Sequence, residues 1–458
     1  MSRDQRDDPR VIAAQVLLAV ETDDAYVNLL LPARLAKTHL SARDKAFATE
    51  LTYGTQRLQG RYDWIISRCL DRPLGQLDPE VRVILRLGVH QLLGMRVPTH
   101  AAVSATVDAC RSLTHRGGVG LVNAVLRRVA READEWDARI DAIADDDTRR
   151  AVKTSHPRPV VQALRASLAA HGMGDQIDQL LEADNHTPWV TLVARPGLVS
   201  LDDLADEVED TLDVDVAYGQ ISPWGLIISG GDPARIRSVQ RGFAAVEDEG
   251  SQLVAGVLAS APLEGDDRRW LDMCAGPGGK TALLAALAGP DVAIDANEVS
   301  ASRARLVEDS CRAFDTVNVR HGDGTTIDED PPYDRVLVDA PCTGLGSLRR
   351  RPESRFRNRT RQVPELSSLQ VRLLSHALAC TRVGGLVAYS TCSPHVAETL
   401  RVVERARETR ETELVDAVAL AHDIAPGDHD FGTGPFLQLW PHRDGTDAMF
   451  LALMRVVS

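Results

Sequence analysis

The chain has 458 residues and a formal net charge of −14; 44% of its residues are apolar, 26% are charged and only 4% are aromatic. This composition excludes a disordered or collagen-like chain, and no apolar run approaches the ~18 residues of a membrane span. The length predicts about three domains. We expect a cytoplasmic protein with no membrane partner, because the apolar run at 11–20 leads into acidic residues and makes a poor signal peptide.

The first predicted domain is helical. Between residues 10 and 130, six segments are apolar at a spacing of three and four residues, with short polar, glycine or proline breaks between them, which predicts helices. Ser41 followed by Asp44 is a capping pattern that begins one of them. No titratable cluster in this part suggests chemistry, so we predict that residues 1–135 form an all-α bundle suited to gripping a partner.

The next stretch predicts a smaller module. Residues 131–155 are charged and alanine-rich, which indicates a linking helix, and alternating strands around an acidic helix follow over the next ~80 residues. We assign residues 136–240 to this linker and a small α+β subdomain.

From about residue 241 the chain alternates apolar strands with helices. Strand–helix units of this length favour parallel pairing, and the commonest product is an open, doubly wound Rossmann-like sheet. Residues 241–458 are therefore predicted to be an α/β domain, with its ligand beyond the carboxyl ends of the strands.

The net charge hides an uneven distribution. Residues 1–130 are net basic, and the acidic C-terminal part contains LRRRPESRFRNRTR at 348–361, with seven arginines and one acid. A solvated arginine-rich loop is the ordinary interpretation, but a focused basic strip also holds a phosphate backbone. We predict RNA-binding roles in this strip for Arg349, Arg350, Arg351, Arg355 and Arg357.

The cysteines indicate a reducing compartment. The chain has seven, with no C-x-x-C pair, so we expect no disulfide framework and no metal site.

A glycine-rich turn is the first chemical motif. CAGPGGKT at 274–281 joins a predicted strand to a predicted helix, and glycines allow a ligand to approach the N–H groups of a helix start. A Walker loop would need glycine where Cys274 stands, and a nicotinamide fingerprint would need it at Thr281. The remaining interpretation is the turn of an S-adenosylmethionine site.

Acidic residues near the following strand ends fit that interpretation. Asp295 lies 16 residues after Gly279, where an acid accepts both ribose hydroxyls, although Glu298 competes for this role and the sequence does not decide between them. Asp323, beyond the third strand, is placed to accept a hydrogen bond from the adenine amino group. The alternative is that such aspartates only cap helices or shape turns.

Two cysteines close the fourth and fifth strands, in DAPCTG (339–344) and STCS (390–393). Cys342, Cys392 and Asp339 therefore share one rim with the predicted methyl donor. A thiolate that adds to C6 of a pyrimidine turns C5 into a nucleophile, and a second group assists release, while a carboxyl group near N3 stabilises the charge on the ring. Two buried structural cysteines are the alternative.

The whole chain resembles the RsmB/Sun family of bacterial 16S rRNA cytosine-C5 methyltransferases. LTYGTQR and LVNAVLRR resemble a NusB-type RNA-binding domain, and the middle module falls where the family has its RNA-recognition-like subdomain. The phrases that carry the resemblance, in the family's order, are EDEGSQLVA, LDMCAGPGGKT, VLVDAPCTGLG, RRRPESRF, PELSSLQVRLL, YSTCS and LWPHRDGTD.

The resemblance implies roles for individual positions. The nucleophile is Cys392, Cys342 helps to release product, and Asp339 contacts N3 of the base; DNA cytosine methyltransferases instead attack with the proline-linked cysteine. Asn297 stands where an acid is frequent in the family, which returns weight to Glu298. The implied donor-binding residues are Cys274, Ala275, Gly276, Pro277, Gly278, Gly279, Lys280, Asp295, Asp323 and Asp339.

The sequence therefore predicts a monomeric enzyme that methylates C5 of a cytosine in 16S rRNA with S-adenosylmethionine. A cytosine methyltransferase of transfer RNA shares the catalytic phrases and stays an alternative. A non-catalytic RNA-binding assembly factor is the rival from another class, and the complete set of Asp339, Cys342 and Cys392 argues against it.

Overall fold

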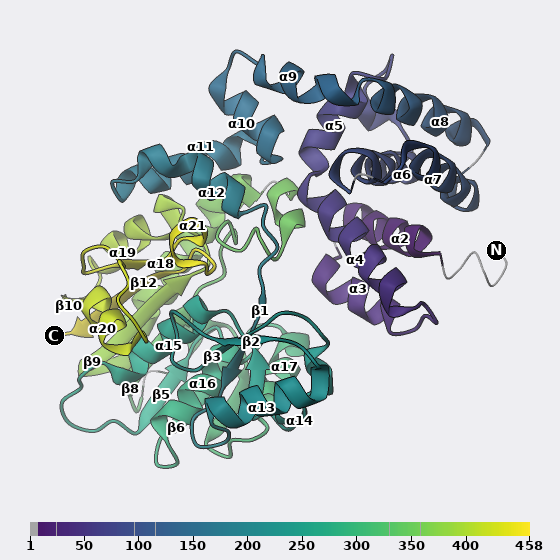
Figure 1. Ribbon diagram of the computed structural model, residues 1–458. Coiled ribbons are helices and arrows are strands. Elements are labelled where there is room, and N and C mark those ends of the chain that lie inside the picture. The colour runs from purple at the N-terminus through teal and green to yellow at the C-terminus, as the bar shows by residue number, and fades with distance from the viewer. Residues whose placement is uncertain (1–7, 24, 96, 115, 329, 358) are drawn as a thin grey trace. The chain divides into compact units, whose positions relative to one another are not determined.

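The computed structural model describes residues 8–458 except 24, 96, 115, 329 and 358 (Figure 1). It divides into two compact units. The helical unit comprises the chain up to Leu168 together with Met173–His186 and Leu348–Asn358, and the sheet unit comprises Ala169–Gly172, Thr187–Ser347 and Arg359–Ser458. A segment from the second half of the sequence, Leu348–Asn358, is thus part of the helical unit.

The helical unit follows the predicted pattern of short amphipathic helices, which enclose an apolar core containing Leu51, Ile84 and Leu126. The expected cap is confirmed at Ser41, whose hydroxyl accepts a hydrogen bond from the Asp44 N–H at 3.2 Å. The helices are α2 (Pro9–Thr22), α3 (Val27–Leu35), α4 (Ala42–Arg57), α5 (Gln59–Ser67), α6 (Pro79–Val89), α7 (Thr99–Leu113), α8 (Arg116–Arg131), α9 (Trp136–Asp141), α10 (Asp146–Thr154), α11 (Arg158–Ala170) and α12 (Ile177–Ala183).

The sheet unit begins with a four-stranded antiparallel sheet in the order β2-β3-β1-β4. Alternate strand residues such as Leu192 and Leu226 pack with Leu204 and Val208 of a covering helix, as expected of a sheet with one buried face. The elements are β1 (Val190–Ala194), α13 (Leu201–Leu212), β2 (Val216–Tyr218), β3 (Gly225–Ile228), α14 (Arg237–Arg241) and β4 (Ala244–Val246).

The main sheet has eight strands in the order β10-β12-β9-β8-β5-β6-β7, with β11 paired to β12. The pairs among β5–β9 are parallel, and those of β12 with its neighbours are antiparallel. The strands are β5 (Arg269–Asp272), β6 (Ala293–Glu298), β7 (Val317–His321), β8 (Tyr333–Asp339), β9 (Thr381–Thr391), β10 (Thr412–Val415), β11 (Leu437–Gln438) and β12 (Phe450–Val456).

Helices cover both faces of this sheet, as predicted for a doubly wound fold. Leu253, Leu283 and Val418, on the helices of one face, share a core with strand residues such as Leu337, whereas Leu374 and Val402 pack against the other face. The helices are α15 (Glu249–Ser260), α16 (Gly279–Ala288), α17 (Ala301–Cys311), α18 (Val363–Cys380), α19 (Leu400–Ala406), α20 (Ala417–Ile424) and α21 (Pro441–Asp444).

The parallel arrangement of β5–β9 determines which loops lie together. Because the carboxyl ends of β5–β9 meet along one edge of the sheet, the residues that follow those strands lie near one another. Among the described residues no helix has the length and apolar character needed to cross a bilayer.

Candidate active site

The glycine turn lies at this edge, between β5 and α16. The N–H of Gly276 donates to Glu298 Oε2 at 3.1 Å, and a Cβ at this position would lie 2.2 Å from the same oxygen. Gly278 has φ +104°, a conformation that favours glycine. Glycine at position 276 therefore allows the backbone of the turn to approach the end of β6, where a side chain would overlap the Glu298 carboxylate.

The structure corrects the expectation for Asp295. β6 runs on to Glu298, so Asp295 lies within the strand, and its carboxylate bonds to Tyr333 (2.7 Å), Asn318 (2.9 Å) and Arg320 (2.9 Å). These partners hold the Asp295 carboxylate within the sheet. Glu298 lies at the end of the strand, where it accepts from the N–H groups of Gly276 (3.1 Å) and Ser300 (2.9 Å).

Two further residues shape the donor edge. Asn297 donates from Nδ2 to the carbonyls of Met273 and Gly322, both at 3.1 Å, so it ties together the loops after β5 and β7. Asp323 follows β7 and is exposed, and hydrogen bonds from Thr325 hold the pKa of its carboxyl below the usual value. Asp323 therefore lies at the predicted edge as a carboxylate.

Lys280 and Asp339 form an ion pair between the donor turn and the end of β8. Lys280 Nζ lies 2.8 Å from Asp339 Oδ2, and Ser390 donates to Asp339 Oδ1 at 3.1 Å. Burial alone would lower the pKa of Lys280, but the charges of Asp339 and Glu247 outweigh it and raise that pKa above the ordinary value. The ammonium therefore keeps its proton at neutral pH.

The two cysteines meet beside this pair. The Sγ atoms of Cys342 and Cys392 lie 3.4 Å apart, and both side chains are partly exposed. The hydrogen bond with Cys392, together with burial, raises the pKa of Cys342 well above its ordinary value. Lys280 interacts electrostatically with Cys392, so a cation accompanies one thiol of the pair.

Several residues at this centre were not among the predicted site residues, although Glu247 and Ser251 lie in the phrase EDEGSQLVA that carries the family resemblance. Ser251 accepts from Lys280 Nζ at 3.0 Å, and burial raises the pKa of Glu247 to about 7. Glu398 lies six residues after Cys392 and is fully buried among the two cysteine loops. Only its proximity to STCS in the sequence hinted at such a role.

The arginine segment gives a second correction. Arg355 is only 2% exposed, and its guanidinium donates to the carbonyl of Asp184 (2.6 Å), to the carbonyl of Arg57 (3.1 Å) and to Asn185 Oδ1 (2.7 Å). The prediction that Arg355 binds RNA is wrong, because its side chain is buried and its hydrogen bonds go to residues of the helical unit. Arg349 is also buried, at 7% exposure.

The remaining arginines of the strip lie nearer the surface. Arg351 is exposed and Arg350 partly so. The guanidinium of Arg357 lies 4.0 Å from the ring centre of Tyr26, and that of Arg351 lies 5.8 Å from it. Arg357 also donates to the carbonyl of Ala25. The segment therefore binds both the start of α3 and the helices around Asp184.

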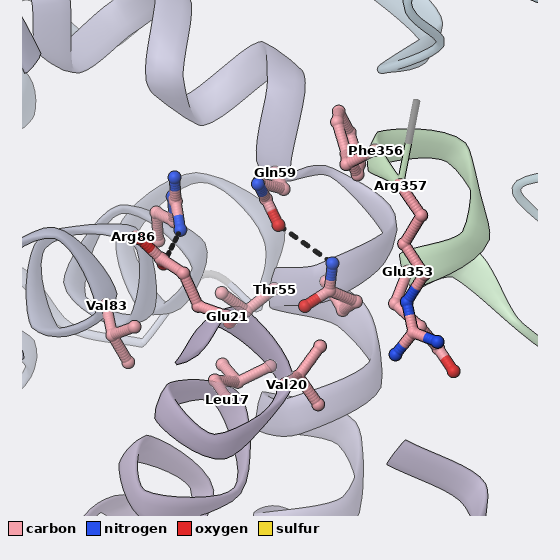
Figure 2. Close-up of a pocket in the computed structure, with 11 residues that line it drawn as sticks. Leu17, Val20, Glu21, Thr55, Gln59, Val83, Arg86, Glu353, Phe356 and Arg357 are labelled. Carbon is pink, nitrogen blue, oxygen red and sulfur yellow. Dashed lines mark hydrogen bonds and ion pairs between the residues drawn. The ribbon is translucent and has the colours of Figure 1, made fainter. Parts of the chain in front are cut away.

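A cavity of about 380 Å³ lies within the helical unit, beside this segment. Figure 2 shows Glu353, Phe356 and Arg357 on one side, facing Leu17 and Val20. Its central polar groups are paired within the protein: Arg86 with Glu21 and Asp63, and Gln56 with Gln59. The Cys342–Cys392 pair and the Lys280–Asp339 ion pair lie in the sheet unit instead.

Comparisons with known proteins identify the family of the chain. Residues 258–455 match the family model described as 16S rRNA methyltransferase RsmB/F, and residues 7–131 match the NusB family. The chain is 46% identical to the putative methyltransferase Rv1407 of Mycobacterium tuberculosis, over 98% of this chain and 96% of that protein. It is 33% identical to ribosomal RNA small subunit methyltransferase B of Pseudomonas putida, over 90% of this chain and 92% of that protein.

Solved structures share the fold. The crystal structure of PH0851 aligns with a TM-score of 0.79 at 23% identity, covering 98% of each chain. The structure of NSun6 from Pyrococcus horikoshii aligns with a TM-score of 0.55 at 17% identity, covering 65% of this chain and 98% of that one.

Proposed function

The chain belongs to the RsmB/F family of 16S rRNA methyltransferases, which use S-adenosylmethionine, and we propose that it methylates C5 of a cytosine in 16S rRNA. The observation that carries the proposal is the pair of thiols 3.4 Å apart at the ends of β8 and β9, beside the Lys280–Asp339 ion pair. Transfer to a ring nitrogen or to an oxygen requires no sulfur nucleophile, whereas C5 transfer does.

The donor site is proposed at the turn from Cys274 to Lys280. Glycine at position 276 lets the turn lie against the Glu298 carboxylate, since a Cβ there would be 2.2 Å from Glu298 Oε2, and the exposed Asp323 follows β7 at the same edge of the sheet. We propose that Glu298 holds the ribose hydroxyls and Asp323 the adenine amino group. The bound donor supplies a methyl group on a positively charged sulfur.

Cys392 is proposed as the nucleophile. Its thiolate, favoured by the Lys280 cation, adds to C6, and the electron pair of the C5–C6 double bond becomes available to C5 for the methyl group. Asp339, held by Lys280 and Ser390, contacts the N3 edge of the cytosine, and the Lys280 cation beside it offsets the negative charge that develops on the ring.

Cys342 is proposed to complete the reaction. Bonding of the Cys392 sulfur to C6 removes the largest cause of the raised pKa of Cys342, so the Cys342 thiol ionises more readily. Its thiolate accepts the C5 proton, the double bond re-forms, and the C6–S electron pair returns to Cys392. The proton then passes to water, which balances the reaction.

The RNA is proposed to contact several parts of the chain. The NusB domain, within residues 1–135, grips structured rRNA, and the exposed Arg351 is the best-placed phosphate ligand of its strip. We propose that residues 136–240 supply the linker and RNA-recognition-like module and residues 241–458 the catalysis, in a monomer. A splayed-out cytosine enters the edge of the sheet.

The test uses labelled S-adenosylmethionine with transcribed 16S rRNA and, separately, transfer RNA. We expect label in 16S rRNA as 5-methylcytosine, at a position that loses the mark when the gene is deleted. Label in transfer RNA alone would contradict the rRNA substrate, and methylation at any atom other than C5 would contradict the mechanism.

A further inference from the structure

One buried carboxylate joins the two cysteine loops. Glu398 ends the short 3₁₀ turn Val396–Glu398 and is 0% exposed. Its Oε1 accepts from the backbone N–H of Thr343 at 2.8 Å, and its Oε2 accepts from the hydroxyl of Ser393 at 2.6 Å. Thr343 follows Cys342 and Ser393 follows Cys392, so a single side chain grips the residue next to each thiol.

Other contacts keep this arrangement rigid. Gln370 of α18 donates to the carbonyl of Pro341 at 2.8 Å and to Glu398 Oε1 at 3.2 Å, so the Cys342 loop is held on both sides of the cysteine. The hydroxyls of Thr343 and Ser393 lie 3.0 Å apart and both donate to Oε2. The hydroxyl of Tyr389 donates to the Glu398 carbonyl at 2.6 Å.

A buried carboxylate at position 398 is unfavourable for folding, and packing alone does not explain its presence. Burial of a carboxylate destabilises the fold unless hydrogen bonds compensate, and the donors around Glu398 are neutral N–H and O–H groups. Hydrogen bonds to an ionised acceptor are shorter and stronger than neutral ones, and a carboxylate has two oxygens that accept from two loops at once. These properties fix the separation of the loops.

We infer that Glu398 is the positioning residue for product release, because it holds the Cys342 loop beside the Cys392 turn. The inference rests on the proposed function. Cys392 attacks C6 through its own sulfur, but release requires Cys342 to reach the C5 proton while Cys392 is bonded to the base. We call the hydrogen bonds of Glu398 to the two cysteine loops the Glu398 clamp. Loosening this clamp therefore slows product release more than it slows the attack of Cys392 on C6.

The test compares wild type with Glu398→Gln on transcribed 16S rRNA and labelled S-adenosylmethionine. Turnover and the denaturant-resistant protein–RNA adduct are measured in the same samples. The amide keeps the shape but has only one acceptor oxygen. We expect turnover to fall ~10- to 100-fold, the adduct fraction to rise, and the KM of the donor to stay within about threefold. Glu404→Gln, an exposed acid on α19 paired with Arg401, is the matched control and should behave as wild type.

A second background separates positioning from general support of the fold. If Glu398 acts through Cys342, Glu398→Gln adds little to Cys342→Ala, whereas independent roles give multiplied effects. Multiplied effects, or slower turnover without more adduct, would overturn the inference. If Glu398→Gln does not fold, Thr343→Val, which removes one hydroxyl donor to the clamp, must raise the adduct fraction instead. A wild-type enzyme without product or adduct would contradict the proposed function rather than the clamp.

Discussion

The sheet edge and the arginine segment both bury charged side chains, but they use them differently. At the edge, Lys280 bonds to the carboxylate of Asp339, whose side chain is 30% exposed, and the Cys342–Cys392 pair lies beside them. In the segment Leu348–Asn358, the Arg355 guanidinium is 2% exposed and bonds mainly to backbone carbonyls. A charged group that is paired with ionisable side chains at a partly exposed edge can take part in catalysis. A charged group that is hydrogen-bonded to buried carbonyls stabilises the fold instead.

The largest expected effect separates the two thiols. Cys392→Ala should lower methyl transfer by at least ~10³-fold and give no adduct, because no other group supplies the bond to C6. Cys342→Ala should lower turnover by ~10²-fold and accumulate adduct, because attack proceeds but release does not. Denaturing gels with labelled RNA distinguish the two. Adduct on Cys392→Ala would show that the proline-linked cysteine is the nucleophile.

The next effect tests the cation at the edge. Lys280→Met keeps the length of the side chain and removes its charge, so we expect ~10²-fold slower single-turnover transfer. Since the pKa of Lys280 is raised above its ordinary value, wild type keeps this charge across the neutral range. The variant should therefore need a higher pH to reach its maximum rate, because its thiol ionises without the nearby cation. An unchanged pH profile would assign Lys280 to donor binding alone.

The same contrast explains what the sequence predicts. Asp339, Cys342 and Cys392 follow strands that the apolar pattern marks clearly, and parallel strands bring such residues to one edge. Asp295 was misplaced because DVAIDANEVS does not reveal where the strand ends. Strand limits depend on pairing with neighbours: Glu298 pairs with His321 of β7, which extends the strand past Asp295.

Arg355 and Glu398 lie beyond such reasoning for another reason. The partners of Arg355 include a carbonyl 298 residues away, and the partners of Glu398 come from two loops 50 residues apart. From local composition alone, Arg355 is one arginine of a basic strip and Glu398 is an acid like many others in the chain. Only the tertiary fold shows that both side chains are buried and hydrogen-bonded to distant parts of the chain.

The third prediction compares two arginines of the strip. Arg355→Ala removes several hydrogen bonds and leaves buried carbonyls without a donor, so we expect the free energy of unfolding of the helical unit to fall by ~2–4 kcal/mol. Arg351→Ala, at an exposed position, should change stability by less than ~0.5 kcal/mol and weaken RNA binding with a shallower salt dependence. Thermal unfolding and RNA titration at several salt concentrations measure both. Normal stability in Arg355→Ala would contradict its structural role.

The smallest expected effect is on how the free energy of unfolding depends on pH. Burial raises the pKa of Asp272 to about 7, so between the ordinary carboxyl pKa and about 7 the native state keeps a proton that the unfolded chain has lost. The free energy of unfolding therefore falls as the pH rises through this window and levels off above it. Asp272→Asn, which keeps an acceptor for the Thr281 hydroxyl, should reduce that slope by roughly 1 kcal/mol per pH unit. Glu404→Gln, which changes an exposed acid paired with Arg401, should leave the slope unchanged, because it removes no buried carboxyl group. Urea unfolding between about pH 5 and pH 7 measures both variants, and equal slopes in wild type and Asp272→Asn would show that the buried charge at the sheet edge exchanges no proton on folding.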